Sequence, residues 1–427
     1  MKPHPSPEWE VLLEPFRDLF TQPGYRHFCA FVIAFAHLDG RLHVTAVLLS
    51  GWAPARHFTT LYRFLREGRW DVEAVRRRVW AVCQQRLVSA GKAGKRVFFA
   101  VDDTVCAKWG RLFAWLGWHH DPMNRQHPKQ LSHGHCWVCL ALLVEQIPGH
   151  WVALFLGCAL YVQEAVCGSR RGFVTKLTLA AQLASELFVP AGTVMVLVAD
   201  GAYARTEFVH ALLAEGRHLV SRLRSDTSFD DLPPVRKKGQ KGAPRKYGKH
   251  HRGLEWAATM QRWHPVTLRL YGKTAHLAIK SRVVIQPTFG VRIRLVAVKW
   301  GKRPLVFLFS TDTQMTAEEI IRVYCARFSI ETGFRDSKQL FGFSTYQVRS
   351  EEAIERIVHL CLWAQTLLRL VCWNERVVPI GGDWRKSLGY LTLGQQKQLS
   401  WEQCRIIEGS HPGTETVEKG DELARAA

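Results

Sequence analysis

Acidic side chains follow two apolar runs that have the character of buried strands. Asp102 and Asp103 follow the run VFFAV, and Asp200 follows VMVLVA. Side chains at the carboxyl ends of strands in an α/β sheet meet at a crevice, which is where such folds bind ligands. Carboxylate oxygens at that place suit magnesium or manganese. Taken singly, Asp103 fits a helix cap equally well, and Asp200 with Gly201 fits a plain turn.

A third acid lies on a predicted helix. Thr316 and Glu319 have the spacing of a capping box, and Gly342 lies where a helix would end. We therefore place a helix over Ala317–Leu340, with an interruption at Gly333.

This helix carries the pattern Y-x2-R-x3-E-x6-K, at Tyr324, Arg327, Glu331 and Lys338. At about 100° per residue, the four side chains lie within roughly 60° of one another on one face. A carboxylate flanked by basic groups and a tyrosine hydroxyl suits a metal ligand whose neighbours bind phosphates. A solvated helix with an ordinary Arg327–Glu331 ion pair has the same pattern.

The pattern resembles the signature of the DDE transposases of bacterial insertion sequences, the group with the Y-R-E-K motif. The sequence D-D-T at residues 102–104 and the apolar strand before Asp200 add two further parts in the family's order. The resemblance spans roughly residues 97–342.

The resemblance implies a ribonuclease H-like core in which Asp103, Asp200 and Glu331 are the catalytic acids and hold two divalent metal ions. These ions are magnesium, for which manganese can substitute. In this family the first acid directly precedes a threonine, which selects Asp103 and leaves Asp102 as the fallback. Two metal ions about 4 Å apart activate a water or a 3′-hydroxyl and stabilise the leaving oxygen.

The implied activity is that of a DNA transposase, which cleaves transposon ends and joins the 3′-hydroxyl to target DNA. Its partners are double-stranded DNA with terminal inverted repeats and a second copy of the chain, in a homodimer. Tyr324, Arg327 and Lys338 would hold phosphates. Family members also stack a flipped base on a tryptophan of the insertion. The equivalent strand here has none, and Trp300 is the nearest candidate.

The elements that position these residues divide into a helical part and a strand-rich part. Residues 28–88 have a helical pattern, broken at Asp39-Gly40 and at residues 50–54. After Pro54, Phe58, Leu61 and Leu65 share one face, while Arg56 and Arg63 lie on another. A helix-turn-helix recognition helix has this pattern, and so does an ordinary amphipathic helix.

Apolar runs predict strands at residues 96–101, 137–144, 151–160 and 194–199, with a helix at 175–187. Four more strands are predicted at residues 266–271, 276–285, 291–299 and 305–310. The fold class is therefore α/β, a ribonuclease H-like mixed sheet with helices, a β-rich insertion and an N-terminal helical domain.

Residues 236–252 are basic, rich in glycine and free of acidic residues. We expect a loop that neutralises the DNA backbone. Its candidate DNA contacts are Lys237, Lys238, Lys241, Arg245 and Lys246.

We divide the chain into five regions. They are a DNA-binding domain at 1–92, the first part of the catalytic core at 93–225, the insertion at 226–312, the second part of the core with C-terminal helices at 313–408, and a disordered tail at 409–427.

Composition agrees with a nucleic-acid partner. Of 427 residues, 58 are lysine or arginine and 37 are aspartate or glutamate, so the net charge is +21. Such an excess favours a polyanion. The eleven cysteines are scattered and no signal peptide is evident, so we expect a bacterial cytoplasmic protein that associates with the nucleoid. The most apolar helix, residues 353–373, carries too many polar groups to span a membrane.

Three other interpretations have some support. A zinc site would draw on His119, His120, Asp121, His127, His133, His135, Cys136 and Cys139. However, the single C-x2-C pair lacks a second pair, and packed core cysteines fit the apolar run better. A catalytically silent DNA-binding protein would not need all three acids. A related nuclease, which cuts without joining, has the same sequence features.

Overall fold

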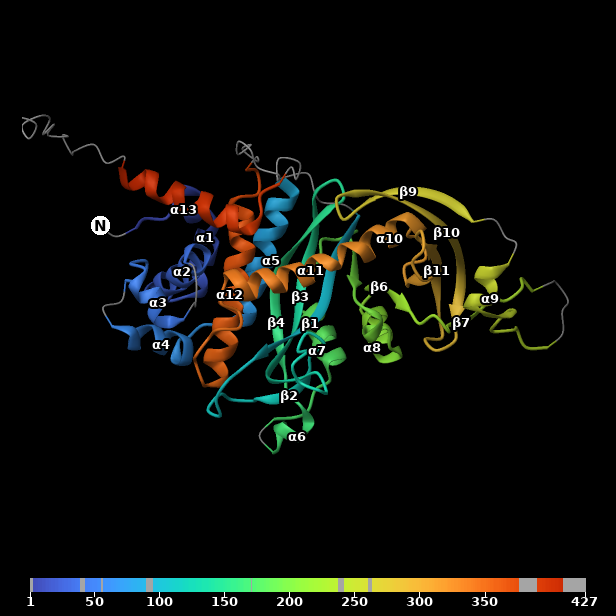
Figure 1. The fold of residues 1–427 in the computed structure, drawn as a ribbon, viewed down its shortest axis with the longest axis horizontal. Coiled ribbons are helices and arrows are strands. Elements are labelled where there is room, and N and C mark those ends of the chain that lie inside the picture. Colours follow the sequence, from blue (N-terminus) through green and yellow to red (C-terminus); the bar gives the residue numbers. More distant parts are fainter. Residues whose placement is uncertain are drawn as a thin grey trace, which may run out of the picture.

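The structure, a computed structural model, describes residues 3–38, 43–54, 57–89, 95–169, 171–236, 242–259, 263–375 and 390–409. Figure 1 shows helices from both ends of the chain packed together beside the central strands. The β-rich segment lies on the other side of those strands. The polypeptide therefore passes from helices into a sheet and returns to helices.

The N-terminal part is helical, as the sequence predicts. Its elements are α1 (Pro7–Leu13), the 3-10 helix η1 (Glu14–Leu19), α2 (Gln22–His37), α3 (Val44–Leu49), α4 (Phe58–Glu67) and α5 (Val72–Ser89). On α4, Leu61 and Leu65 are fully buried, whereas Phe58 is 42% exposed. The expected apolar face of this helix therefore includes Leu61 and Leu65 but only part of Phe58, which lies in its first turn.

Five strands form the central mixed sheet. They are β1 (Arg96–Ala107), β3 (Leu131–Ile147), β4 (His150–Tyr161), β5 (Val194–Val198) and β6 (His218–Leu223). β3 pairs antiparallel with both β1 and β4, whereas β5 is parallel to β1 and to β6. Around them lie β2 (Gly117–His120), α6 (Glu164–Cys167), α7 (Lys176–Ser185), η2 (Gly201–Tyr203) and α8 (Thr206–Ala214). This mixed sheet with flanking helices confirms the predicted α/β, ribonuclease H-like class.

The β-rich segment continues the same sheet. Its elements are β7 (Ser228–Asp230), β8 (His250–Arg252), α9 (Gly253–Ala258), β9 (His264–Leu270), β10 (Lys273–Gln286), β11 (Val291–Lys299) and β12 (Val306–Ser310). β12 pairs antiparallel with β6, so a twelve-stranded sheet runs through the described residues. The predicted insertion is thus hydrogen-bonded edge to edge with the central strands.

Among the residues that the structure describes, four helices follow: α10 (Ala317–Ala326), α11 (Phe328–Leu340), α12 (Glu351–Val371) and α13 (Leu393–Gly409). The Thr316 side chain accepts a hydrogen bond from the backbone N–H of Glu319, as a helix cap does. The predicted single helix is interrupted at Arg327 and not at Gly333, which lies inside α11. The tail beyond residue 409 lies outside the described residues.

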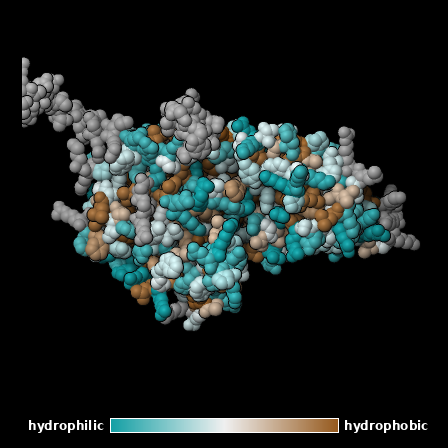
Figure 2. Space-filling view, viewed as in Figure 1, coloured by the Kyte–Doolittle hydropathy of each residue, from teal (hydrophilic) through white to brown (hydrophobic). Residues whose placement is uncertain are grey.

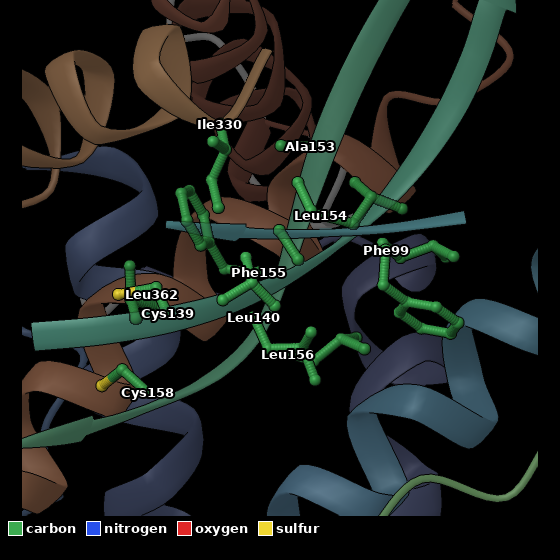
Figure 3. Close-up of a cluster of buried hydrophobic side chains, with 14 of the residues drawn as sticks. Phe99, Cys139, Leu140, Ala153, Leu154, Phe155, Leu156, Cys158, Ile330 and Leu362 are labelled. Carbon is green, nitrogen blue, oxygen red and sulfur yellow. The ribbon is translucent and has the colours of Figure 1, made fainter. Parts of the chain in front are cut away.

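Gly333 brings α11 close to the sheet. A Cβ atom at this position would lie 2.8 Å from a ring carbon of Phe155 on β4. The Phe155 ring also stacks on Phe334, with centroids 5.4 Å apart, and lies in the same buried cluster as Ile330 (Figure 3). Because β4 pairs with β3 and β3 with β1, this contact fixes the helix that carries Glu331 above the acids of β1.

Gly333→Ala is therefore expected to destabilise the fold. Overpacking costs about 1–3 kcal/mol, which exceeds the gain of about 1 kcal/mol that alanine brings to a helix interior. Urea unfolding measures the change. Gly394→Ala on α13 is the control, since a Cβ there would meet nothing within 4 Å. An unchanged unfolding free energy for Gly333→Ala would show that α11 has room to shift.

The most apolar helix, α12, is buried around most of its circumference. The Trp363 indole donates to the backbone carbonyl of Leu156 at 2.7 Å, and the Thr366 hydroxyl donates to that of Phe155 at 2.8 Å. Among the described residues, none of the helices is long and apolar enough to cross a membrane. The apolar character of α12 is accounted for by its packing between β4 and the N-terminal helices.

Candidate active site

Asp102 and Asp103 lie inside β1. The sequence predicts this strand to end at Val101, but it continues to Ala107. Successive side chains of a strand point to opposite faces of its sheet. The Lys176 ammonium on α7 lies 2.7 Å from Oδ2 of Asp103. The Arg327 guanidinium, at the junction of α10 and α11, lies 2.7 Å from Oδ2 of Asp102. Asp102 therefore faces α11, and Asp103 faces α7.

Arg327 connects Asp102 with Glu331. Its Nη1 atom contacts Asp102, and its Nη2 atom lies 2.6 Å from Oε1 of Glu331. The Arg327 side chain is only 15% exposed and Glu331 is 41% exposed, so the guanidinium is enclosed while the glutamate opens to solvent. A planar guanidinium can donate to two carboxylates at once. The acid of β1 that shares a cation with Glu331 is Asp102.

Asp200 follows β5 and lies near Asp102. The parallel register pairs Ala100 with Val198, so the two acids are level, each two residues further along its strand. Burial raises the pKa of the Asp102 carboxyl to about 7; Arg327 opposes this rise, and the charges of Asp200 and Asp103 add to it. Asp200 also accepts a hydrogen bond from the backbone N–H of Ala202 at 2.8 Å, so it makes the turn that the sequence allows.

A cleft of about 840 Å³ opens beside Asp200. Its wall includes Tyr324 and Arg327 from the signature helices, together with three more arginines, which are Arg205, Arg222 and Arg224. All three are exposed. Sequence patterns do not indicate these arginines, because nothing in their local sequence shows that β6, which carries Arg222, lies beside β5. A cleft that combines a carboxylate with several guanidinium groups suits a phosphodiester substrate.

Asp103 has a separate set of partners. Besides Lys176, its carboxylate accepts hydrogen bonds from the hydroxyl of Tyr203 and the thiol of Cys136, both at 3.4 Å. These groups lie on the face of β1 away from Glu331. Strand alternation thus places Asp102, and not the predicted Asp103, on the face of β1 that carries the contact with Arg327 and Glu331. Asp102 is therefore the candidate for the first acid on geometric grounds, and the catalytic role of Asp103 stays a prediction.

Comparison with known families assigns the chain. Residues 15–277 match the family model described as DDE superfamily endonuclease, which covers more than half of the chain. The protein belongs to the DDE superfamily of endonucleases. The matched residues include Asp102, Asp103 and Asp200 and end before Glu331.

Among solved structures, the chain is similar to piggyBac transposase in a synaptic complex with hairpin DNA, determined by cryo-EM. The sequence identity is 10% and the TM-score is 0.41, over 92% of this chain and 74% of that chain. A comparison with curated proteins gave no match.

The acids of this DDE endonuclease fit a divalent cation in their chemistry. Asp102, Asp200 and Glu331 supply oxygen ligands, which magnesium prefers. As they are placed, the described residues contain no group of three histidine, cysteine, aspartate or glutamate side chains close enough to hold a metal ion. Arg327 lies between Asp102 and Glu331 and provides the positive charge there. The guanidinium would have to leave Glu331 before the carboxylates could share a metal ion.

The cysteines considered for zinc are packed in the sheet. Cys136 and Cys139 both lie on β3 with no exposed surface. This placement agrees with the predicted packed core cysteines of an apolar strand.

The remaining signature residues differ in their placement. The Lys338 ammonium on α11 donates to the backbone carbonyl of Val105 at 2.7 Å, so it links the helix to β1. Tyr324 on α10 lines the cleft, and burial raises the pKa of its hydroxyl above the ordinary value although Arg327 opposes this. The α11 side of β1 is thus contacted by Arg327 at Asp102 and by Lys338 at Val105, with Glu331 bound to Arg327 between them. Tyr324 reaches the cleft from the preceding helix, α10.

The predicted DNA contacts outside the signature lie on other elements. Arg63 on α4 is exposed and pairs with Glu67 at 3.2 Å. Arg245 and Lys246 are exposed residues between β7 and β8. Four of the predicted contacts lie outside the described residues, namely Arg56, Lys237, Lys238 and Lys241.

Trp300 follows β11 and is half-buried. Its ring lies parallel to that of Tyr271, with centroids 6.3 Å apart, and the Arg303 guanidinium lies 4.2 Å from its centroid. Tyr271 and Arg303 would both have to move before a base could stack on Trp300. The role of Trp300 in stacking a flipped base therefore stays a prediction.

Proposed function

We propose that this endonuclease is a DNA transposase of the Y-R-E-K group of bacterial insertion sequences. The observation that carries the proposal is the contact of Arg327 with both Asp102 and Glu331, beside Asp200 and a cleft lined by arginines. Carboxylates next to guanidinium groups provide for a cation and a phosphodiester in one place. The Y-R-E-K spacing assigns the group.

In this proposal Asp102, Asp200 and Glu331 hold two divalent metal ions, with magnesium as the natural ion. Bound there, such ions would activate the attacking oxygen and stabilise the leaving oxygen of the displaced phosphate. In the free chain, Arg327 holds Glu331 and Asp102 in place. On binding of DNA it donates to a phosphate oxygen, since a guanidinium binds phosphate in the same bidentate way as it binds a carboxylate.

The DNA backbone would follow the basic groups on either side of the acids. Arg205, Arg222 and Arg224 would hold phosphates in the cleft, with the hydroxyl of Tyr324 as a further donor. Lys338 keeps donor capacity beyond its bond to Val105, because an ammonium has three hydrogens. These contacts position the scissile bond without reading sequence.

The other parts of the chain would serve recognition. We assign binding of the terminal inverted repeats to residues 1–92, with Arg63 on α4 as a contact, and backbone neutralisation to the insertion at 226–312. The regions at 93–225 and 313–408 together form the catalytic core. A homodimer would hold two transposon ends, as the resemblance implies, and the complex would associate with the nucleoid.

A cleavage assay tests the proposal. The full chain, incubated with duplex DNA that carries the sequences flanking its gene, is expected to cut at the repeat ends when magnesium or manganese is present. Removing the metal with a chelator should stop cutting while binding persists, because the phosphate contacts do not need it. Ends cut beforehand, offered with plasmid DNA, should be joined to it.

The outcomes separate the alternatives. Cutting without joining of the pre-cut ends would identify a nuclease of the same superfamily. Binding without any cutting, in either metal, would identify a catalytically silent DNA-binding protein. Cutting that persists in the chelator would contradict the metal chemistry proposed here.

A further inference from the structure

A second cavity lies at the Ala107 end of β1, apart from the cleft beside Asp200. It has a volume of about 690 Å³ and lies where β1 ends and β3 begins. The lining side chains that matter are Trp109, Arg111, Trp118, Asn124, His127 and His133. We call it the Trp109–Trp118 cavity. None of the functional roles assigned above uses it.

Two tryptophans of this cavity are open to solvent. Trp109 is 95% exposed and Trp118 is 54% exposed, whereas buried tryptophans such as Trp137 fill the neighbouring core. Trp118 is nevertheless held in place, since its ring lies 5.1 Å from the ring of His133 and 5.8 Å from that of His127. A ring that is both exposed and positioned binds a flat partner with little loss of conformational entropy.

The charge of the cavity favours an anionic partner. Arg111 is exposed, and the lining residues that the structure describes include no aspartate or glutamate. Asp121, which follows β2, accepts a hydrogen bond from the hydroxyl of the lining residue Ser132 at 2.9 Å. On the face that Figure 2 shows, apolar residues are scattered among hydrophilic ones. Two aromatic rings with a cation suit a nucleotide better than a hydrophobic protein partner.

The cavity lies in line with the acids. β1 leads from Asp102 past Val105, whose carbonyl binds Lys338, to Ala107 at the cavity wall. Five strand residues span about 17 Å, which corresponds to about five nucleotides of a stacked DNA strand. A strand whose phosphates follow Arg327 and Lys338 along α11 would therefore reach the two tryptophans.

We propose that the Trp109–Trp118 cavity binds unpaired nucleotides of the DNA strand that leaves the active site, with bases stacked on both indoles and Arg111 on a phosphate. Paired bases are covered by their neighbours in the duplex, so stacking on an exposed ring requires an unpaired base. The inference rests on the proposed function, because it names the form of DNA that the site takes. It concerns binding and not catalysis.

The test compares two DNA ligands by fluorescence anisotropy, with the full chain in a chelator so that no cutting occurs. One ligand is a paired duplex, and the other is the same duplex with a single-stranded extension of ten thymidines. Wild-type protein is expected to prefer the extended ligand. Trp109→Ala and Trp118→Ala should each weaken its binding about fivefold or more and leave paired-duplex binding unchanged.

Three controls make the result specific. Phe188→Ala removes an aromatic ring that is 76% exposed elsewhere and should change neither affinity. Trp109→Phe keeps a stacking ring and should restore most of the preference. Arg111→Ala should reduce the slope of log affinity against log salt by about one, whereas the tryptophan variants leave that slope unchanged.

Equal affinity of the wild-type chain for the two ligands would overturn the inference, as would tryptophan variants that keep the preference. If those variants instead changed only the sedimentation mass, the cavity would be a contact between copies of the chain and the inference would fail. Failure of the wild-type chain to bind either ligand would refute the proposed function itself, which is a separate result.

Discussion

Replacing Glu331 with glutamine is expected to abolish cleavage and joining while leaving binding to transposon ends nearly intact. Glutamine keeps the shape of the side chain and can still accept the hydrogen bond from Arg327, which lies 2.6 Å from Oε1 in the wild type. What is lost is the negative charge that would hold a metal ion. A loss of at least about a thousandfold in the cleavage rate is expected, which corresponds to about 4 kcal/mol.

Glu318→Gln on α10 is the matched control, since it makes the same chemical change in the helix just before. It should cleave at the wild-type rate. The measurement is a gel-shift and a cleavage assay on the same preparations, with magnesium and with manganese. Wild-type cleavage by Glu331→Gln would remove the third acid from the proposed site.

Arg327→Ala and Lys338→Ala offer a contrast with the glutamate. Both side chains are proposed to hold phosphates, so their removal should weaken end binding first, by about 1.5–3 kcal/mol each, because charge-assisted hydrogen bonds are lost. Metal-dependent cleavage should persist at high protein concentration. The two classes of variant thus distinguish a metal ligand from a phosphate contact on the same stretch of helix.

Much of the fold follows from the spacing of apolar residues. The strand predicted at Val291–Lys299 has the same bounds in the structure. Its first half alternates apolar and polar residues, and its second half is a short apolar run that is buried, and both patterns are typical of strands. The helix after Thr316 begins where the capping residues predict. These elements are fixed by local sequence, so local sequence suffices to find them.

The site depends on contacts between distant segments, which the sequence does not show. The break at Arg327 carries no glycine or proline that would indicate it, and Gly333 marks a close approach to Phe155 instead of a break. Arg222 joins the cleft only because β6 pairs with β5. The resemblance to DDE transposases indicates three acids. Whether the first of them is Asp102 or Asp103 depends on which side chain lies on the face of β1 that α11 covers.

Which aspartate of β1 is the first acid can be tested by comparing Asp102→Asn with Asp103→Asn. Asp102→Asn is expected to lower metal-dependent cleavage by at least about a thousandfold, because it removes the charge of a proposed metal ligand on the α11 face of β1. Arg327 keeps its bond to Glu331 in this variant, so the helix should stay in place. Asp103→Asn should retain cleavage to within about tenfold, since its carboxylate faces Lys176 and Tyr203.

The two variants should also differ in stability. Asp103→Asn removes the ion pair with Lys176, whose side chains are 26% and 34% exposed, so solvent screening limits the expected loss to about 1 kcal/mol. Asp102→Asn removes a carboxylate whose pKa burial has raised to about 7, and whose ionisation at neutral pH therefore opposes folding. It should cost less in urea unfolding than Asp103→Asn, although it costs more in cleavage. An inactive Asp103→Asn beside an active Asp102→Asn would return the first metal ligand to Asp103, the residue that directly precedes Thr104.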